Sequence, residues 1–451
     1  MNDEQAVVTN KVDKKLPAGQ TFTLGLQHVL AMYAGAVAVP LIVGAAAGLT
    51  QTQLAILVAC DLFTCGLATL IQTLGIKNFI GIKFPVVMAC TFTAVGPMVG
   101  IAQMSGIQAV FGAIIVAGIM VFLLSPYFAK LIRFFPPVVT GSIIVIIGLS
   151  LIPVGINNAA GGVGSESFAS PQNLLLALFV LLIILIVNKY FKGFVQSIAI
   201  LIGLLIGTIV AAFMGMVDFA AVSNAHWVKI VRPFMLGLPK FEFGAIITMC
   251  ITSLVVMVES LGCFIGMGEI CDRPATEHDV VKAYRAEGIA TFLGGIFNSF
   301  PYTTFFQNVG LVTLTKVTSR FVVAGAGVIL IVLGCIPKFA ALATIIPLPV
   351  FGGAMIIMFT MVAVSGFRML QEVDFTDNNN MLIAACSIGI GVGISVVPGL
   401  FEYTPPIIQT IFGESGIVTG SLAAIILNLF FNFKNYRKSN SVKEEAVSAS
   451  E

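Results

Sequence analysis

Residues 300–320 read FPYTTFFQNVGLVTLTKVTSR, the most polar stretch in the hydrophobic second half of the chain. The stretch begins with a Phe-Pro break, carries adjacent amides at Gln307 and Asn308, and closes on the basic Arg320. Apolar segments lie on both sides of it. An unpaired polar group in hydrocarbon costs several kcal/mol, so a stretch that only had to sit in lipid would not carry two amides. We therefore expect residues 300–320 to line a cavity and to face a polar ligand.

The composition indicates a polytopic membrane protein. The chain is 58% hydrophobic and 10% charged, whereas soluble domains carry about 25% charged residues. A net charge of +2 gives no indication of nucleic-acid binding, and the polar first 20 residues lack the apolar core of a cleavable signal peptide. The eight cysteines contain no CxxC pair and are interpreted as small buried hydrophobes. Without an HExxH, GxSxG or P-loop motif, we expect no enzyme, no metal site and no cofactor, and any pumping must draw on an ion gradient.

A membrane span needs about 20 mostly apolar residues, and fourteen segments of the chain approach this pattern. The predicted fold class is therefore an all-α polytopic membrane protein with about 14 transmembrane segments. The third and tenth segments are short and are interrupted by Pro or Gly. The approximate limits are 22–46, 52–74, 84–101, 105–127, 134–156, 172–190, 194–216, 243–268, 280–298, 303–317, 321–341, 343–366, 380–401 and 416–433.

The distribution of basic residues supports this number of spans. If both termini are cytoplasmic, the 23 Lys and Arg residues fall on the cytoplasmic side with four exceptions, Lys229, Arg232, Lys240 and Lys338. Three of those four share one longer loop, where the positive-inside rule is weaker. An odd number of spans would break the alternation, so we expect both termini in the cytoplasm.

Two copies of seven spans would lie in opposite orientations, because seven is odd. Phe84-Pro85 opens the third segment and Phe300-Pro301 opens the tenth. Paired short, interrupted segments in corresponding halves point to a transporter site near the bilayer midplane. Chance recurrence of Phe-Pro in a chain with 36 Phe residues is the alternative, but the matching shortness of both segments favours a 7+7 inverted repeat.

Four ionisable residues within predicted spans are candidates for a functional or structural role. Glu259 is deep in the eighth span, where a carboxyl group usually faces an interior cavity; a carboxyl paired with nearby backbone is the alternative. Glu287 begins the ninth span, and its proximity to Arg285 makes a structural role a stronger alternative there. His28 is a candidate proton relay or hydrogen-bonding partner, or a helix-packing residue. For Asp61 we favour a structural role, hydrogen-bonded to a neighbouring helix.

Aromatic and polar residues meet at the two breaks. Phe92 lies beside Thr91 in the third segment, and Phe305 lies two residues before Gln307 in the tenth. A flat heteroaromatic ligand needs a ring to stack on and amides or carboxylates at its edge. Core packing is the usual fate of a Phe in so aromatic a chain, and only their position favours a binding role for these two.

These residues resemble the nucleobase–ascorbate transporters, also called the nucleobase:cation symporter-2 family. The signature Gln-Asn-x-Gly followed by Thr and Ser-Arg matches Gln307-Asn308-Val309-Gly310 through Thr315 and Ser319-Arg320. The Gln-His of the first span matches Gln27-His28. The resemblance covers roughly residues 20–435, and a Gln at the first signature position is typical of the purine branch. Within the family the chain most resembles bacterial xanthine permeases.

The resemblance implies uptake of xanthine across the bacterial plasma (inner) membrane by proton symport with alternating access. Urate or a broader set of purines is the alternative substrate, and an anion exchanger or channel on the same fold is a distant one. The implied substrate-binding residues are Glu259, Gln307, Phe92, Phe305, Phe306 and Thr91. The implied coupling and supporting residues are Glu287, His28 and Asn308.

The resemblance also implies a division into a core domain and a gate domain, with a homodimer formed through the gate. The expected parts are a cytoplasmic tail (1–20), core segments (21–127 and 243–342), gate segments (128–242 and 343–434) and a second cytoplasmic tail (435–451). Two positions depart from the family pattern. Cys263 stands where several members carry an acidic or polar residue, and Glu287 stands where some members carry Asp.

Overall fold

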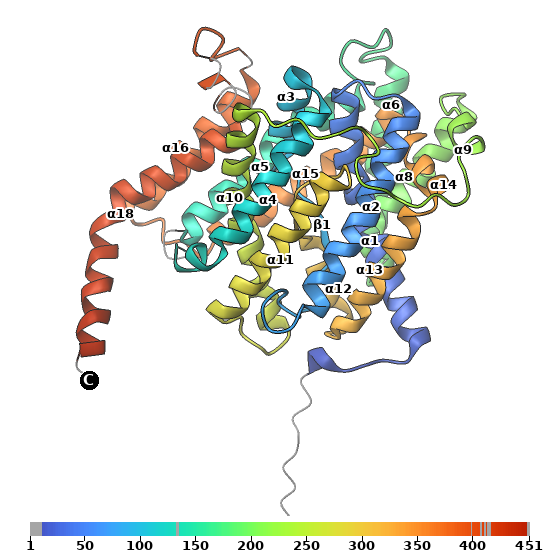
Figure 1. Ribbon diagram of the computed structural model, residues 1–451. Helices are drawn as coiled ribbons and strands as arrows, with labels where there is room; N and C mark the ends of the chain where they lie inside the picture. The colour runs from blue at the N-terminus through green and yellow to red at the C-terminus, as the bar shows by residue number, and fades with distance from the viewer. Residues whose placement is uncertain are drawn as a thin grey trace, which may run out of the picture. The chain divides into compact units, whose positions relative to one another are not determined.

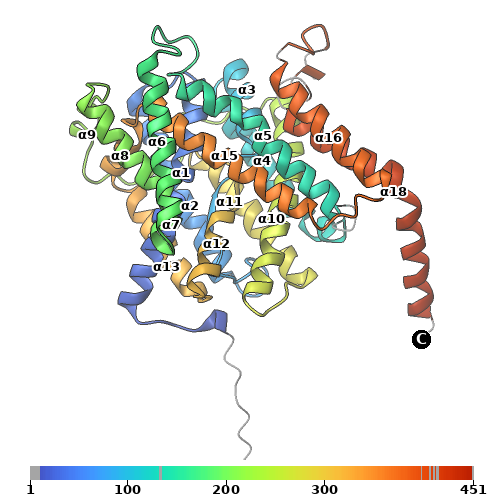
Figure 2. The same cartoon turned by 180° about the vertical axis from the view of Figure 1, so that it is seen from behind.

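The computed structural model describes residues 11–131, 135–397, 399–405, 408, 409, 412 and 416–448. Apart from two three-residue strands, its elements are helices (Figures 1 and 2). In chain order they are η1 (Lys11–Asp13), α1 (Ala18–Ala46), α2 (Gln51–Leu74), β1 (Met88–Cys90), α3 (Val95–Ser105), α4 (Ile107–Leu131), α5 (Pro137–Ala159), α6 (Pro171–Tyr190), α7 (Phe194–Ser197), α8 (Ala199–Phe213), α9 (Ala220–Ser223), α10 (Phe243–Ile270), α11 (Glu277–Ile296), β2 (Tyr302–Thr304), α12 (Phe306–Thr315), α13 (Arg320–Gly334), α14 (Pro337–Thr344), α15 (Leu348–Leu370), α16 (Asn378–Val396) and α18 (Gly416–Ser448).

Among the described residues, eight helices are long and apolar enough to cross a membrane, or nine if the bent pair α13 and α14 forms one span. The eight are α1, α2, α4, α5, α6, α10, α15 and α16. The other predicted segments also contain helices, but these helices are shorter, as in α8 and α13, or more polar, as in α11. The protein is thus a helical membrane protein, and a count of fourteen crossings stays a prediction.

A short strand follows each of the two predicted breaks, β1 after Phe84-Pro85 and β2 after Phe300-Pro301. β1 and β2 pair antiparallel, with Met88 opposite Thr304, Ala89 opposite Thr303 and Cys90 opposite Tyr302. The short helix α3 follows β1, and the similarly short α12 follows β2. In Figures 1 and 2, α3 and α12 lie toward opposite ends of this part of the molecule. The sequence predicted the interruptions but not their pairing as a sheet.

Small residues allow close packing between helices from the two halves of the chain. A Cβ atom added to Gly66 in α2 would lie 2.5 Å from the carbonyl oxygen of Gly327 in α13. No side chain fits between the two backbones, so glycine permits this approach. The contact holds α2 and α13 side by side.

Helix α11 begins with a capping box. The Thr276 side chain accepts a hydrogen bond from the Asp279 amide at 3.2 Å, and Asp279 accepts one from the Thr276 amide at 3.3 Å. Asp279 also forms a buried ion pair with Lys282, at 2.7 Å. Although burial opposes ionisation, the hydrogen bonds from Lys282 and Thr276 lower the pKa of the Asp279 carboxyl below its usual value. The first turn of α11 is therefore fixed by its own sequence.

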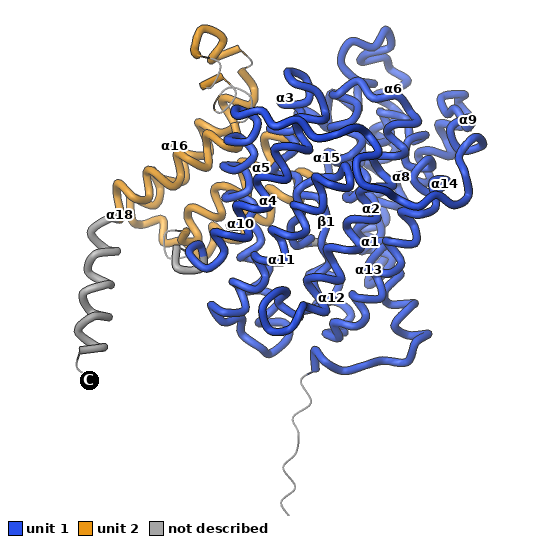
Figure 3. The backbone as a smooth tube through the Cα atoms, in the orientation of Figure 1, with its two compact units in different colours: residues 1–129, 153–358 blue, residues 130–152, 359–451 orange. Residues whose placement is uncertain are grey.

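The chain divides into two compact units (Figure 3). Unit 1 comprises residues 1–129 and 153–358, and unit 2 comprises residues 130–152 and 359–451. Unit 1 contains both strands and every residue predicted to bind substrate. In unit 2, α16 and α18 pack against each other, and the Ser395 hydroxyl donates to the Ser150 hydroxyl at 2.8 Å. The predicted core and gate domains stay a prediction.

Candidate functional site

Glu259 is a partly accessible carboxylate in the middle of α10. Its neighbours Val258 and Ser260 are buried, whereas Glu259 itself retains accessible surface. Its Oε2 atom accepts hydrogen bonds from the Thr93 hydroxyl at 2.7 Å and from the Thr91 hydroxyl at 3.3 Å. Its Oε1 atom makes no hydrogen bond with the described part of the chain. One oxygen is therefore anchored, and the other has no donor among the described residues and can accept a hydrogen bond from a ligand.

Thr91 and Thr93 lie on the segment that joins β1 to α3. Both side chains are buried, and the Thr93 amide donates to the Thr91 hydroxyl at 3.1 Å. The Thr91 amide donates to the Pro301 carbonyl at 3.0 Å, which ties this segment to the second break. Sequence analysis selected Thr91 and missed Thr93, which makes the shorter bond. The Thr-x-Thr spacing was the available signal, because a threonine hydroxyl can accept from the backbone amide two residues later and so close a turn, here one that brings both hydroxyls to the same carboxylate.

The second break places aromatic residues near α1. Phe305 is 5% exposed, and its amide donates to the Val87 carbonyl at 2.9 Å. A Cβ atom added to Gly35 of α1 would lie 2.5 Å from Cζ of the Phe305 ring, so the ring packs directly on the glycine backbone. Phe306 is 49% exposed. The Gln307 backbone lies in the first turn of α12, and its side chain lies outside the described part of the structure.

The Thr91-bearing segment also carries Phe92, which is 6% exposed. Both half-helices that follow the strands lack a side-chain cap, because the residue before α3 is Ala94 and the residue before α12 is Phe305. Each therefore begins with backbone N–H groups that receive no cap from the preceding side chain. Such helix ends attract partial negative charge on a ligand.

Asn308 and His28 form a buried contact between α12 and α1. The Asn308 Nδ2 atom lies 3.0 Å from His28 Nδ1 and donates to the His28 carbonyl at 3.1 Å. Because Nδ2 is a donor, His28 Nδ1 accepts, which leaves the ring proton of a neutral imidazole on Nε2. The Asn308 Oδ1 atom is buried without a hydrogen-bond partner in the described structure. The two residues that the signature selects thus meet directly.

Glu287 is a buried carboxyl group on α11 and is 2% exposed. The Ser260 hydroxyl and the Thr304 amide lie near it, and Glu259 is within electrostatic reach. The Ser260 hydroxyl is, however, paired with the Thr303 hydroxyl at 2.8 Å. Neither Glu287 oxygen has a hydrogen-bond partner of normal geometry among the described residues. Holding a negative charge in this position is unfavourable.

Asp61 is fully buried in α2, and its partners are more extensive than the sequence suggested. They come from the two breaks as well as from α2, where a single neighbouring helix was expected. Two are thiols, of Cys65 and Cys90, so these cysteines act as hydrogen-bond donors in addition to filling space. All eight cysteines are free thiols, and three of them, Cys250, Cys335 and Cys386, are not fully buried.

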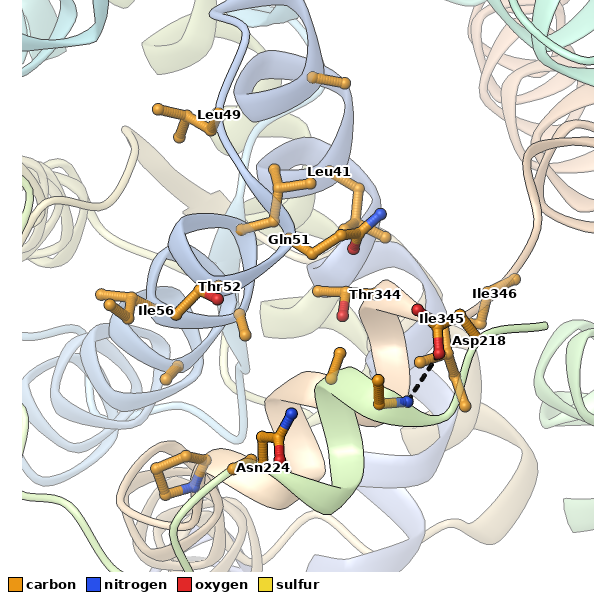
Figure 4. Close-up of a pocket in the computed structure, with 18 of the residues that line it drawn as sticks. Leu41, Leu49, Gln51, Thr52, Ile56, Asp218, Asn224, Thr344, Ile345 and Ile346 are labelled. Carbon is orange, nitrogen blue, oxygen red and sulfur yellow. Dashed lines mark hydrogen bonds between the residues drawn. The ribbon is translucent and has the colours of Figure 1, made fainter.

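A separate cavity of about 880 Å³ lies in unit 1 (Figure 4). Its walls are the C-terminal part of α1, the first half of α2, the loop around α9, and the residues from α14 to the start of α15. Figure 4 shows Gln51, Thr52 and Thr344 among its polar lining residues, with Asp218 accepting a hydrogen bond from the Ala220 amide at 2.8 Å. Neither Glu259 nor Glu287 contributes to its lining.

Comparison with known proteins identifies the class of molecule. A family model described as a permease family (Xan_ur_permease) matches residues 19–400. The chain is 51% identical over 428 residues to the xanthine permease of Bacillus subtilis (strain 168), covering 95% of this chain and 97% of that protein. It is 52% identical over 415 residues to the uric acid permease PucK of the same organism, covering 92% and 96%.

Among solved structures, the transmembrane domain of a cyanobacterial bicarbonate transporter, BicA, matches with a TM-score of 0.61. The match covers 92% of this chain and 100% of that one at 15% identity, which shows a shared fold alone. The sequence-based recognition from Gln27-His28 and the Gln307 signature is confirmed by the family match. The chain therefore belongs to this permease family, the nucleobase–ascorbate or nucleobase:cation symporter-2 transporters, and is a membrane transporter and not an enzyme.

Proposed function

We propose that this protein takes up xanthine across the bacterial plasma membrane by proton symport with alternating access. The substrate class is supported by relatives named for xanthine and uric acid at about half sequence identity. The observation that carries the proposal is the Glu259 carboxylate, which two threonine hydroxyls hold inside the fold through Oε2 and whose Oε1 atom has no hydrogen-bond partner among the described residues. A neutral purine with ring N–H groups is the matching ligand.

Recognition of xanthine would use acceptors and donors at its edge and aromatic rings on its faces. Glu259 would accept ring N–H bonds, and Gln307 would present one amide donor and one acceptor to an adjacent carbonyl and N–H. Phe92 and Phe305 would flank the ring, since aromatic faces bind flat heterocycles. The Phe306 backbone amide, at the start of α12, would donate to a ring carbonyl, and Thr91 would hold the Glu259 carboxylate.

The family membership and the distribution of basic residues support a proposal for the membrane topology. We propose fourteen crossings in a 7+7 inverted repeat, with β1–α3 and β2–α12 as the two broken spans and both termini in the cytoplasm. The distribution of Lys and Arg supports this orientation. We also propose that segments 1–4 and 8–11 form the core domain, that segments 5–7 and 12–14 form the gate, and that two copies associate through the gate.

Proton coupling is assigned to Glu287. Its carboxyl group is buried and lacks hydrogen-bond partners among the described residues, so protonation removes an unfavourable charge. A core that carries a neutral Glu287 would change between its outward and inward states at lower cost. The Asn308–His28 contact would hold α12 against α1 during this movement and modulate the affinity for substrate.

Urate is the second candidate substrate, because one relative at 52% identity is named for uric acid. A free inorganic anion is disfavoured, because it brings no ring N–H donor that would offset its repulsion by the Glu259 carboxylate. Uptake of labelled xanthine in cells without other purine carriers tests the proposal, with competition by urate, bicarbonate and sulfate. We expect unlabelled urate to reduce the uptake of labelled xanthine, and bicarbonate and sulfate to leave it unchanged. Uptake of bicarbonate or sulfate without uptake of either purine would refute it.

A further inference from the structure

The Asp61 carboxylate, which is 0% exposed, is the centre of a buried hydrogen-bond cluster. Its Oδ1 atom accepts from the Ser299 hydroxyl at 2.6 Å and from the Tyr302 hydroxyl at 2.9 Å. Its Oδ2 atom accepts from the Cys65 thiol at 3.7 Å and from the Cys90 thiol at 3.5 Å, and the Cys90 thiol shares its single proton with the Ala36 carbonyl oxygen at 3.4 Å. No Lys or Arg of the described chain lies within salt-bridge distance. Four neutral donors therefore stabilise one buried carboxylate, which would be costly without them.

The cluster joins both breaks to α2. Cys90 is the last residue of β1 and Tyr302 is the first of β2, and these two residues are directly opposite in the strand pair. Both donate to the same carboxylate, one to each oxygen. The Ser299 and Tyr302 hydroxyls also lie 2.6 Å apart, so the two donors on the β2 side contact each other as well as Asp61. A shift of either strand by one residue would carry its donor away from Asp61.

The residues that follow these donors belong to the proposed substrate site. Cys90 is followed directly by Thr91 and Phe92, and Phe305 lies three residues after Tyr302. The strand register therefore fixes the spacing between the threonine segment that holds Glu259 and the aromatic segment at α12.

We propose that Asp61 is a positioning residue that fixes the register of β1 against β2. It thereby sets the width of the purine slot, which we define as the space between the Thr91–Phe92 segment and Phe305. This inference rests on the proposed function. Xanthine and urate differ by a carbonyl on the five-membered ring, so a change in slot width changes the ratio of their transport efficiencies. Asp61 acts through the strands and does not touch substrate.

The test compares Asp61→Asn with Thr64→Val in purified protein and in cells. Asp61→Asn keeps an acceptor for the Ser299 and Tyr302 donors but turns a nitrogen donor toward the thiols. Thr64→Val is the matched control, because Thr64 is equally buried in the same helix, and among the described residues its hydroxyl bonds only to the Cys60 carbonyl, at 2.8 Å. Hydrogen–deuterium exchange of peptides covering residues 86–95 and 299–306 reports on the strand pair without requiring transport.

We expect Asp61→Asn to speed exchange in both peptides, to raise the KM for xanthine by at least about tenfold, and to change the xanthine-to-urate ratio of kcat/KM. Thr64→Val should change none of these. Unchanged exchange would overturn the inference, and so would faster exchange with unchanged KM and ratio, which indicates a structural role alone.

If Asp61→Asn does not reach the membrane, Tyr302→Phe is the second variant, because it removes one donor and leaves the carboxylate. We expect it to change the exchange rate, the KM for xanthine and the xanthine-to-urate ratio in the same directions. The absence of these changes would overturn the inference. A wild-type protein that transports neither purine would instead refute the proposed function, and the exchange measurement would still decide whether Asp61 fixes the strand pair.

Discussion

Replacing Glu259 by glutamine changes the proposed site at one atom while keeping its shape. In the wild type, the Thr91 and Thr93 hydroxyls both donate to Oε2, whereas Oε1 has no partner in the described part of the chain and can accept from a ligand. A glutamine that keeps its oxygen on the threonines must place its NH2 group where Oε1 lies in the wild type. That group would then meet the purine N–H donor against donor.

The magnitude follows from the bond that is lost. A hydrogen bond to a charged group contributes about 1.5–3 kcal/mol, which corresponds to an affinity loss of about 10–150-fold. Two donors that face each other without an acceptor add a further penalty. In the opposite orientation of the amide, the Thr91 and Thr93 hydroxyls would accept from the NH2 group, and the purine N–H would meet a neutral acceptor in place of the charged one. We therefore expect a loss of at least about tenfold in xanthine binding.

The assay is equilibrium binding of labelled xanthine to purified protein, together with uptake in cells lacking other purine carriers. Glu269→Gln is the matched control, because it makes the same chemical change at an exposed position of the same helix. Glu259→Asp keeps the charge and should retain part of the binding. Wild-type affinity in a well-expressed Glu259→Gln protein would refute the assignment of Glu259 to the site.

Four other substitutions test separate parts of the account. Gln307→Glu removes an amide donor and should weaken xanthine uptake by about 1–3 kcal/mol, measured by competition with xanthine, urate, guanine and uracil. Glu287→Gln should retain xanthine binding but lose accumulation, measured with and without a protonophore; accumulation like that of the wild type would rule out Glu287 as the coupling group. Gly35→Ala adds a methyl group 2.5 Å from the Phe305 ring and should raise the KM, with an overpacking cost of about 1–3 kcal/mol. Asp279→Asn leaves its buried lysine partner uncompensated and should lower the melting temperature, because breaking a buried ion pair costs about 3–5 kcal/mol; an unchanged melting temperature would show that the pair is not stabilising.

The membrane class, the family and the two breaks could be read from the sequence, because each depends on local pattern. Long apolar runs indicate spans by their length alone. The Phe84-Pro85 and Phe300-Pro301 pairs mark the places where the helical pattern stops. Glu259 could be selected because a carboxylate within an apolar helix needs a polar surrounding.

The contacts between distant segments could not be read in the same way. The antiparallel pairing of β1 with β2 joins residues separated by more than 200 positions, and each strand is too short to show a sheet pattern by itself. Thr93 was missed because its role depends on how closely this segment approaches α10. The partners of Asp61 were missed for the same reason, since they converge only after both breaks fold against α2.

The most direct test of the central claim is xanthine transport by the purified protein in proteoliposomes under an imposed gradient. With an acidic exterior and no sodium, labelled xanthine should accumulate inside the vesicles. A protonophore should abolish that accumulation, and Glu259→Gln protein should show none. Accumulation that survives the protonophore and requires a sodium gradient would contradict proton symport, and the absence of any xanthine movement by correctly folded wild-type protein would contradict the proposed function itself.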